Sequence, residues 1–128
     1  MTFFESLTTP SWIPPDWVFP AAWFTLWALQ LAAVSILVSS ENQGRFVALG
    51  LLATHFVGAV MWQAVIFAPG RLDFGAWWLL GVLVLVILAT VAAWRVTPIA
   101  GALIAPTIVW MSVATTLGFS LASLNPGA

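Results

Sequence analysis

Four long apolar runs, almost free of charge, constrain this chain more than any other feature. Only 5% of its 128 residues are charged, 62% are hydrophobic, and the mean hydropathy is +1.09. About a quarter of the residues in an ordinary soluble domain are charged, and about 20 consecutive apolar residues let a helix cross a bilayer. The sequence therefore predicts an all-α integral membrane protein, a bundle of four transmembrane helices embedded in the lipid bilayer.

Turn-forming residues set the limits of the four runs. Pro15 precedes the first run, Gly44 the second, Pro69 and Gly70 the third, and Pro98 lies at the start of the fourth, as is common at helix ends. We expect one membrane domain over residues 1–128, with helices at about 18–38, 46–67, 74–94 and 98–124. Because the connections are short, consecutive helices should be antiparallel neighbours. Four spans in a multi-pass protein place both termini on the same side of the membrane.

Charge and composition argue against several classes of function. The net charge is −1 and the chain has only three arginines and no lysine, so no basic patch is available for a nucleic acid. The absence of cysteine removes thiolate chemistry and disulfides. The four acidic residues lie in loops or at helix ends, and the apolar runs contain no carboxylate pair, Ser/His/Asp set or glycine-rich phosphate loop. The residues therefore give no support for an enzyme.

Nine tryptophans are the strongest signal for a binding site. Those near the ends of the apolar runs are typical of the membrane interface: Trp12, Trp17, Trp77, Trp78 and Trp94. Four others lie deeper: Trp23, Trp27, Trp62 and Trp110. The spacing of Trp23, Trp27 and Gln30 places them on one helix face. Because an indole offers a flat polarisable face and one N–H donor, these residues predict either a pocket for a planar apolar ligand or packing between helices.

His55 is the single histidine and lies within the second apolar run, seven residues before Trp62 and on the same helix face. Ionisable groups inside a membrane often belong to functional sites. Two interpretations stay open, since His55 could be the axial ligand of a porphyrin metal or could form a hydrogen bond to a neighbouring helix. The sequence indicates no other metal ligand.

Two ladders of small residues predict close packing of helices. In lipid, helices associate where small side chains let their backbones approach each other. The ladders are Gly50, Thr54 and Gly58 in the second run and Ala114, Gly118 and Ala122 in the fourth. We expect these surfaces to be packing seams, within the bundle or against a partner.

Two tryptophan-containing motifs occur toward the two ends of the chain. The first is Trp12-x-Pro14-Pro15-x-Trp17-Val18-Phe19-Pro20-x-x-Trp23-x-x-Leu26-Trp27. The second includes Pro106, Trp110, Ala114, Thr115, Leu117 and Asn125. Together they resemble the motifs of the TspO/MBR family, which comprises translocator proteins and tryptophan-rich sensory proteins. The similarity extends over nearly the whole chain.

The resemblance implies a small helical membrane protein that holds porphyrins, sterols or drug-like aromatic molecules between helices and often dimerises. It assigns Trp23 and Trp110 to the pocket wall. Family members have five spans, and this chain begins at the position of their first loop, so we expect a bundle that lacks the first family helix. Trp27, Thr107 and Gly118 replace a Tyr, a Tyr and an Asn of the family pattern. The expected pocket is therefore more apolar.

The preferred hypothesis is a TspO-like protein that binds a flat apolar ligand and has a sensory or regulatory role. Candidate ligands are a porphyrin, a bacteriochlorophyll-type tetrapyrrole, a carotenoid and a sterol. The expected ligand-binding residues are Trp23, Trp27, Gln30, His55, Trp62 and Trp110. The alternative is a structural accessory subunit of a larger membrane assembly, such as a photosynthetic pigment–protein complex. Its partner would be a second copy or helices of that complex, packed on the flank left open by the missing helix.

Overall fold

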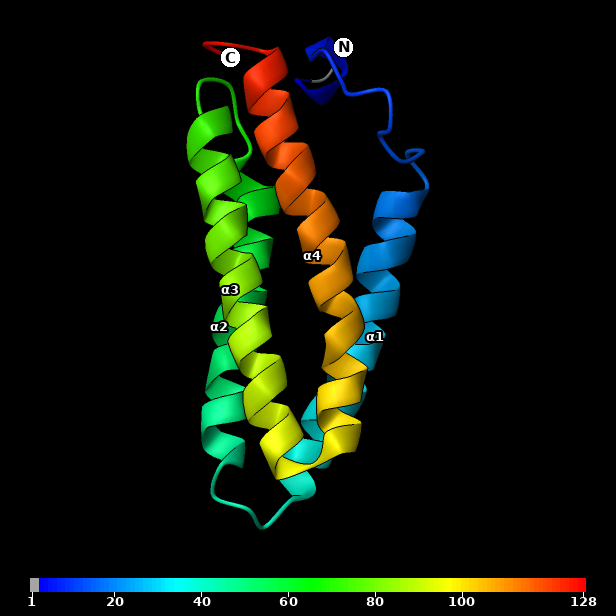
Figure 1. Cartoon of the computed structure of the whole chain (residues 1–128), viewed down its shortest axis with the longest axis vertical. Helices are drawn as coiled ribbons and strands as arrows, with labels where there is room; N and C mark the ends of the chain where they lie inside the picture. Colours follow the sequence, from blue (N-terminus) through cyan, green and yellow to red (C-terminus); the bar gives the residue numbers. More distant parts are fainter. Residues whose placement is uncertain (1–2) are drawn as a thin grey trace.

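A computed structural model describes residues 3–128 and shows a bundle of four long helices (Figure 1). The helices are α1 (Val18–Ser39), α2 (Arg45–Met61), α3 (Leu72–Val96) and α4 (Pro98–Leu124), with a short 3-10 helix, η1 (Phe4–Ser6), before them. A π-helical turn, η2 (Trp62–Ile66), extends α2. Residues 3–128 contain no strand, and all four long helices, with η2 counted as part of α2, have the length and hydropathy needed to cross a membrane. The predicted all-α membrane bundle is confirmed.

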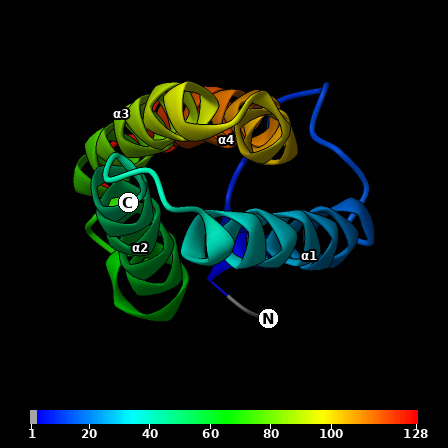
Figure 2. The ribbon, with the colours of Figure 1, turned by 90° about the horizontal axis from the view of Figure 1, so that it is seen from below.

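The helices follow the order α2, α3, α4, α1 around the bundle, and the first and last helices of this order, α2 and α1, pack only loosely against each other. The most extensive interface joins α3 to α4, followed by α2 with α3 and α1 with α4, whereas α1 and α2 touch only sparsely. Figure 2, a view along the bundle, shows α3 and α4 side by side on one side and α1 and α2 on the other. Few contacts join α1 to α2. The α3–α4 hairpin is therefore the frame to which the other two helices attach.

Small residues allow α3 and α4 to approach closely. A Cβ added to Gly101 would lie 2.8 Å from the Cβ and 2.9 Å from the Cα of Trp94, closer than side chains approach a backbone. Farther along α4, a Cβ at Gly118 would lie 3.0 Å from Leu79 and 3.5 Å from the Cα of Ala76. Helix association in lipid relies on such contacts, because apolar side chains gain little by leaving lipid tails for a protein interior.

Polar contacts fix the other two interfaces. The indole of Trp78 on α3 donates to the Gly58 carbonyl of α2 over 2.8 Å, and a Cβ at Gly58 would meet Val82 at 3.0 Å. Between α1 and α4, the buried Gln30 amide donates to the Thr107 hydroxyl over 3.1 Å. In a medium without water these groups have only protein partners, so the bonds help set the register of the helices.

The end of the second span differs from the expected continuous helix at 46–67. The α-helix ends at Met61, and η2 continues the chain with a wider turn that closes when the Phe67 amide donates to the Trp62 carbonyl over 2.9 Å. A π-helical turn adds one residue to a helical turn and changes which side chains share a face. Hydropathy does not reveal this change, because all residues of this turn except Gln63 are apolar.

The N-terminal segment, residues 3–17, crosses the end of the bundle at which the C-terminus lies (Figure 1). The Thr8 amide donates to the Asn125 side-chain oxygen over 2.7 Å, and the Asn125 amide returns a bond to the Thr8 carbonyl over 2.8 Å. The rings of Phe3 and Phe4 lie 5.4 and 6.1 Å from the ring of Phe67 after η2. The segment therefore connects the ends of α2 and α4.

Gly101→Ala should destabilise the bundle by about 1–3 kcal/mol, the usual effect of overpacking, because the new methyl group overlaps the Trp94 backbone. Gly81→Ala is the matched control, since a Cβ at Gly81 meets nothing within 4 Å and alanine favours the helix. Thermal unfolding in detergent should give a lower midpoint for Gly101→Ala and an unchanged or higher one for Gly81→Ala. Equal midpoints would contradict the close contact.

Candidate functional site

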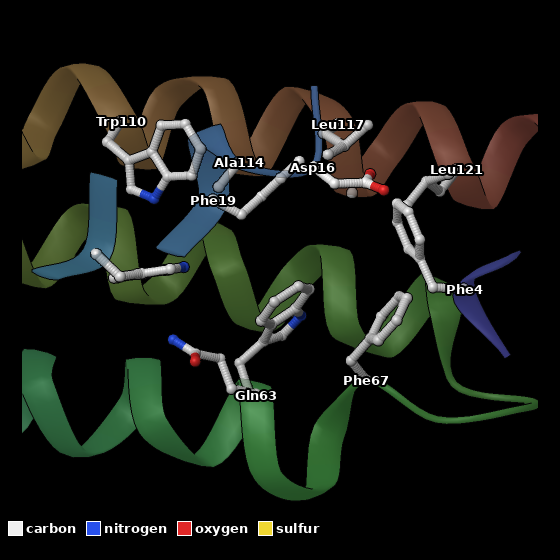
Figure 3. A pocket seen from close by; sticks show the side chains of 12 residues that line it. Phe4, Asp16, Phe19, Gln63, Phe67, Trp110, Ala114, Leu117 and Leu121 are labelled. Carbon is white, nitrogen blue, oxygen red and sulfur yellow. The ribbon is translucent and has the colours of Figure 1, made fainter. Parts of the chain in front are cut away.

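A pocket of about 320 Å³ opens between α1, η2, α4 and the N-terminal segment. Its walls are formed by Phe4, Asp16, Phe19, Trp23, Trp62, Gln63, Phe67, Trp110, Ala114, Leu117, Gly118 and Leu121. Figure 3 shows the α4 residues on one side of the space and Gln63 and Phe67 on the other. The volume is at the lower end of the range of about 300–1,000 Å³ typical of small-molecule sites.

An aromatic wall forms where α1 meets α4. The Trp110 ring contacts Trp23 edge-on, with ring centres 6.2 Å apart and planes at 88°. Phe19 approaches the same indole at 5.5 Å and 72°. Phe19 and Trp23 are four residues apart and therefore lie on one face of α1. This arrangement holds the Trp110 ring in place and leaves one aromatic wall facing the pocket.

The opposite wall is built by η2 and the residue that follows it. The rings of Trp62 and Phe67 lie 5.1 Å apart at a plane angle of 37°. Gly75 on α3 lies beside this indole, and a Cβ there would be in ordinary contact with the Trp62 Nε1 at 3.4 Å. Two aromatic walls, on separate elements, thus face each other across an apolar space.

Trp62 and Gln63, the first two residues of the π-helical turn, both line the pocket. In a regular α-helix neighbouring side chains diverge by about 100°, and a wider turn changes that relation. The guanidinium of Arg71 donates to the Val65 carbonyl over 3.0 Å. This bond occupies a carbonyl that ends the turn, so Arg71 supports the segment that carries Trp62 and Gln63.

Polar groups in the pocket are few. Among the described residues that line it, Asp16 is the only charged one and Gln63 carries the only side-chain amide. Asp16 lies in the turn before α1, where its carbonyl accepts from the Phe19 amide over 3.4 Å. The Trp110 indole nitrogen is buried and has no hydrogen-bond partner among residues 3–128. The pocket is therefore suited to an apolar molecule with limited polar contacts.

The structure brings three of the six expected ligand-binding residues into this pocket: Trp23, Trp62 and Trp110. Trp27 and Gln30 instead line a separate groove of about 400 Å³ between α1 and α2. Trp27 turns toward that groove because Phe24 and Phe56 hold its ring at 5.7 Å on each side. One helix face thus serves two different spaces.

His55 lies in neither space and is 1% exposed. Its Nδ1 donates to the Val82 carbonyl of α3 over 3.0 Å. Of the two interpretations of His55, the geometry favours the hydrogen bond to a neighbouring helix, because the side chain is enclosed between α2 and α3.

The two ladders of small residues have different surroundings. Gly58 and Gly118 pack against α3 inside the bundle, while a Cβ at Gly50 meets nothing within 4 Å. Ala114 and Gly118 also line the pocket, where small side chains leave space for a ligand. Thr54 is exposed and donates to the carbonyl of Gly50 on its own helix over 2.8 Å. Ala122 is half-buried one turn after Gly118.

Sequence reasoning named three of the twelve lining residues as ligand-binding and missed the other nine in that role. Phe19 could have been found, because it precedes Trp23 by one helical turn. Leu117 and Leu121 extend the Trp110 face of α4 in the same way. Gln63 could not be found without the π-helical turn, and Phe4 depends on contacts between residues far apart in the chain.

The fold and the pocket define a class: a multi-pass integral membrane protein whose bundle of four helices contains an aromatic, mostly apolar, ligand-sized pocket. The family model of the TspO/MBR family matches residues 1–124. The chain therefore belongs to the TspO/MBR family, which confirms the resemblance drawn from its tryptophan motifs.

Individual relatives agree with this assignment. Protein CrtK of Rhodobacter capsulatus is 34% identical over 128 residues, covering 98% of this chain and 79% of that protein. A tryptophan-rich sensory protein of Cereibacter sphaeroides is 31% identical over 126 residues, covering 96% and 77%. The human translocator protein is 30% identical over 131 residues, covering 99% and 77%. The similarity thus extends across bacterial and animal members.

His55→Ala should destabilise the bundle by about 1–3 kcal/mol, because it removes an interhelical hydrogen bond and leaves a cavity. Binding of haem and of metal-free protoporphyrin should stay unchanged, since His55 lies outside the pocket. Thermal unfolding and absorption titration measure the two effects. Selective loss of haem binding would instead identify His55 as a metal ligand.

Arg71→Ala should loosen η2, because the Val65 carbonyl loses its guanidinium donor. The amides of residues 62–67 should exchange about three- to tenfold faster, as expected for one hydrogen bond of about 0.5–1.5 kcal/mol. Arg95→Ala at the other end of α3 is the control with the same charge change and should leave this segment unaffected. Hydrogen exchange measured by mass spectrometry makes the comparison. Unaltered exchange in Arg71→Ala would show that the hydrogen bond from Arg71 does not stabilise η2.

Proposed function

We propose that this protein binds a flat, apolar ligand between its two aromatic walls and acts in sensing or regulation. The observation that carries the proposal is the arrangement of Trp23 and Trp110 on one wall and Trp62 and Phe67 on the other. Aromatic side chains on both sides favour a planar ring system, which gains stacking and dispersion contacts on each face.

The chemistry of the walls supports a narrow class of ligands. Apolar and aromatic side chains predominate, so the main contribution to affinity is burial of apolar surface. The unpartnered Trp110 N–H offers one donor to an acceptor on the ligand, because a buried polar group is stabilised once it is paired. A porphyrin, a bacteriochlorophyll-type tetrapyrrole, a carotenoid and a sterol all combine apolar area with few polar groups. With about 320 Å³ available, a large ligand would extend through the opening.

A regulatory role is supported by the absence of catalytic groups in the lining and by the sensory protein among its relatives. The lining residues supply contacts and one carboxylate, with no paired acid and base. Ligand binding to a small membrane bundle is then transmitted by a change in its shape or in its partners.

Replacing Trp23 and Trp110 by Leu should weaken protoporphyrin binding by about 1–3 kcal/mol per lost stacking partner. Trp77→Leu is the matched control, because this ring is 64% exposed and lies outside the pocket. Quenching of intrinsic fluorescence in lipid nanodiscs measures the affinity. The proposal fails if the double variant binds as tightly as the wild type.

An accessory-subunit role is the second candidate, favoured by the groove between α1 and α2. This groove has a volume of about 400 Å³ and is lined mostly by apolar side chains, with the Gln30 amide inside it. The small side chain of Ala53 on α2 lies in its wall. A helix of a second copy or of a larger complex could pack here, because small residues permit close approach in lipid.

Purification in mild detergent separates the two candidates. A ligand-binding sensor should be recovered without stoichiometric partners and should bind protoporphyrin. A subunit should co-purify with fixed partners, and a photoreactive residue replacing Leu31 or Ala53 in the groove should crosslink to them. Recovery of a monomer with no crosslinked partner would eliminate the second candidate.

A further inference from the structure

The pocket has an apolar interior and a polar opening. Trp23 follows Asp16 by seven residues, and two helical turns place it about 10 Å deeper in the membrane. Trp17, next to Asp16, is 71% exposed, as expected for a tryptophan at the interface. In Figure 3, Asp16 lies toward Leu121 and Phe4, while Trp110 lies at the far end of the space. A ligand with its rings among the tryptophans therefore keeps its polar substituents near Asp16.

The opening carries a negative charge on Asp16. Asp16 is the single charged residue among the described residues that line the pocket, and Gln63 offers an amide that can donate or accept. Arg71 lies at the same end of the bundle, but its guanidinium donates to the Val65 carbonyl and does not line the pocket. Among residues 3–128, no side-chain cation in this wall pairs with a ligand carboxylate.

The charged side chains at the two ends of the bundle also favour a cation over an anion at the pocket opening. Among the described side chains at the end of the bundle with the pocket opening, Asp16 and Asp73 carry two negative charges against the one positive charge of Arg71. The opposite end carries one carboxylate and two guanidinium groups, namely Glu41, Arg45 and Arg95. An anion approaching the opening is therefore repelled, and a cation is attracted.

We propose that Asp16 determines the charge preference of the pocket and selects flat ligands whose polar edge is uncharged or cationic. Esters, ketones, hydroxyls, amides and ammonium groups fit the opening, and Gln63 can form hydrogen bonds with the neutral ones. A ligand carboxylate would approach Asp16 beside apolar walls, where repulsion is stronger than in bulk water. This inference rests on the proposed ligand-binding function and narrows its ligand class to molecules whose polar edge is uncharged or cationic.

The test compares metal-free protoporphyrin IX, which carries two carboxylates, with its dimethyl ester, which carries none. Both are titrated against the wild type and Asp16→Asn in nanodiscs of phosphatidylcholine, with fluorescence quenching as the readout. Asp16→Asn should tighten binding of the acid by about two- to tenfold, the range for one or two partly exposed charge pairs. Binding of the ester should stay the same. Because the ester is also more apolar, the diagnostic quantity is the change in the affinity ratio between the two proteins.

Asp73→Asn is the matched control, since it makes the same charge change at the same end of the bundle but Asp73 does not line the pocket. It should leave the ratio near the wild-type value. Raising the salt to about 0.5 M should move the wild-type ratio toward that of Asp16→Asn, because salt screens exposed charges. A porphyrin with cationic side chains should bind Asp16→Asn more weakly than the wild type, which is the opposite of the change expected for the acid.

Two results would overturn the role of Asp16. The affinity ratio could be the same in the wild type and Asp16→Asn, which would mean that ligand carboxylates do not interact with this residue. Asp73→Asn could change the ratio as much as Asp16→Asn, which would assign the preference to the whole end of the bundle. If neither porphyrin binds the wild type, the proposed function itself fails. If the wild type binds both porphyrins and the tryptophan variants bind neither, the proposed function holds. The comparison with Asp16→Asn then tests only the charge preference.

Discussion

The close contact between α3 and α4 is the constraint on which the rest of the structure depends. At Gly101 no Cβ fits against the Trp94 backbone, and at Gly118 a Cβ would press against the end of the Leu79 side chain. The hairpin that results has α2 attached to one side and α1 to the other. The two outer helices contact each other only sparsely. The pocket and the α1–α2 groove are the spaces left by this geometry.

Polar side chains on the helices fall into two groups with different effects. Hydroxyls along the helices donate to the carbonyl four residues earlier on the same helix, as Ser35, Thr90 and Ser112 do. Such bonds satisfy a group that lipid cannot solvate but leave the position of the helix undetermined. Bonds between helices are fewer, and the buried bonds made by Gln30 and His55 each join one helix pair. These interhelical hydrogen bonds specify the register of the helices, while small residues allow the helices to approach closely.

The sequence predicted the four spans well, because hydropathy and the prolines at the helix ends act locally. It also placed Trp23 and Trp110 together, through motifs that resemble those of the family. It did not separate Trp27 from Trp23, because one helix face can border two spaces when the neighbouring helices diverge. Gln63 and Asp16 were missed for other reasons. Gln63 depends on a π-helical turn within an apolar run, and Asp16 lies in a loop whose position depends on contacts far away in the chain.

The attachment of the N-terminal segment has a kinetic consequence. Thr8 and Asn125 exchange two exposed hydrogen bonds, and Phe4 contacts Phe67. At about 0.5–1.5 kcal/mol for each hydrogen bond, lifting this segment from the bundle requires far less free energy than separating the helices. Local opening of this kind occurs many times during the lifetime of the folded state. If a ligand binds in the pocket as proposed, its residence time should depend more on the opening of this segment than on the thermal stability of the four helices.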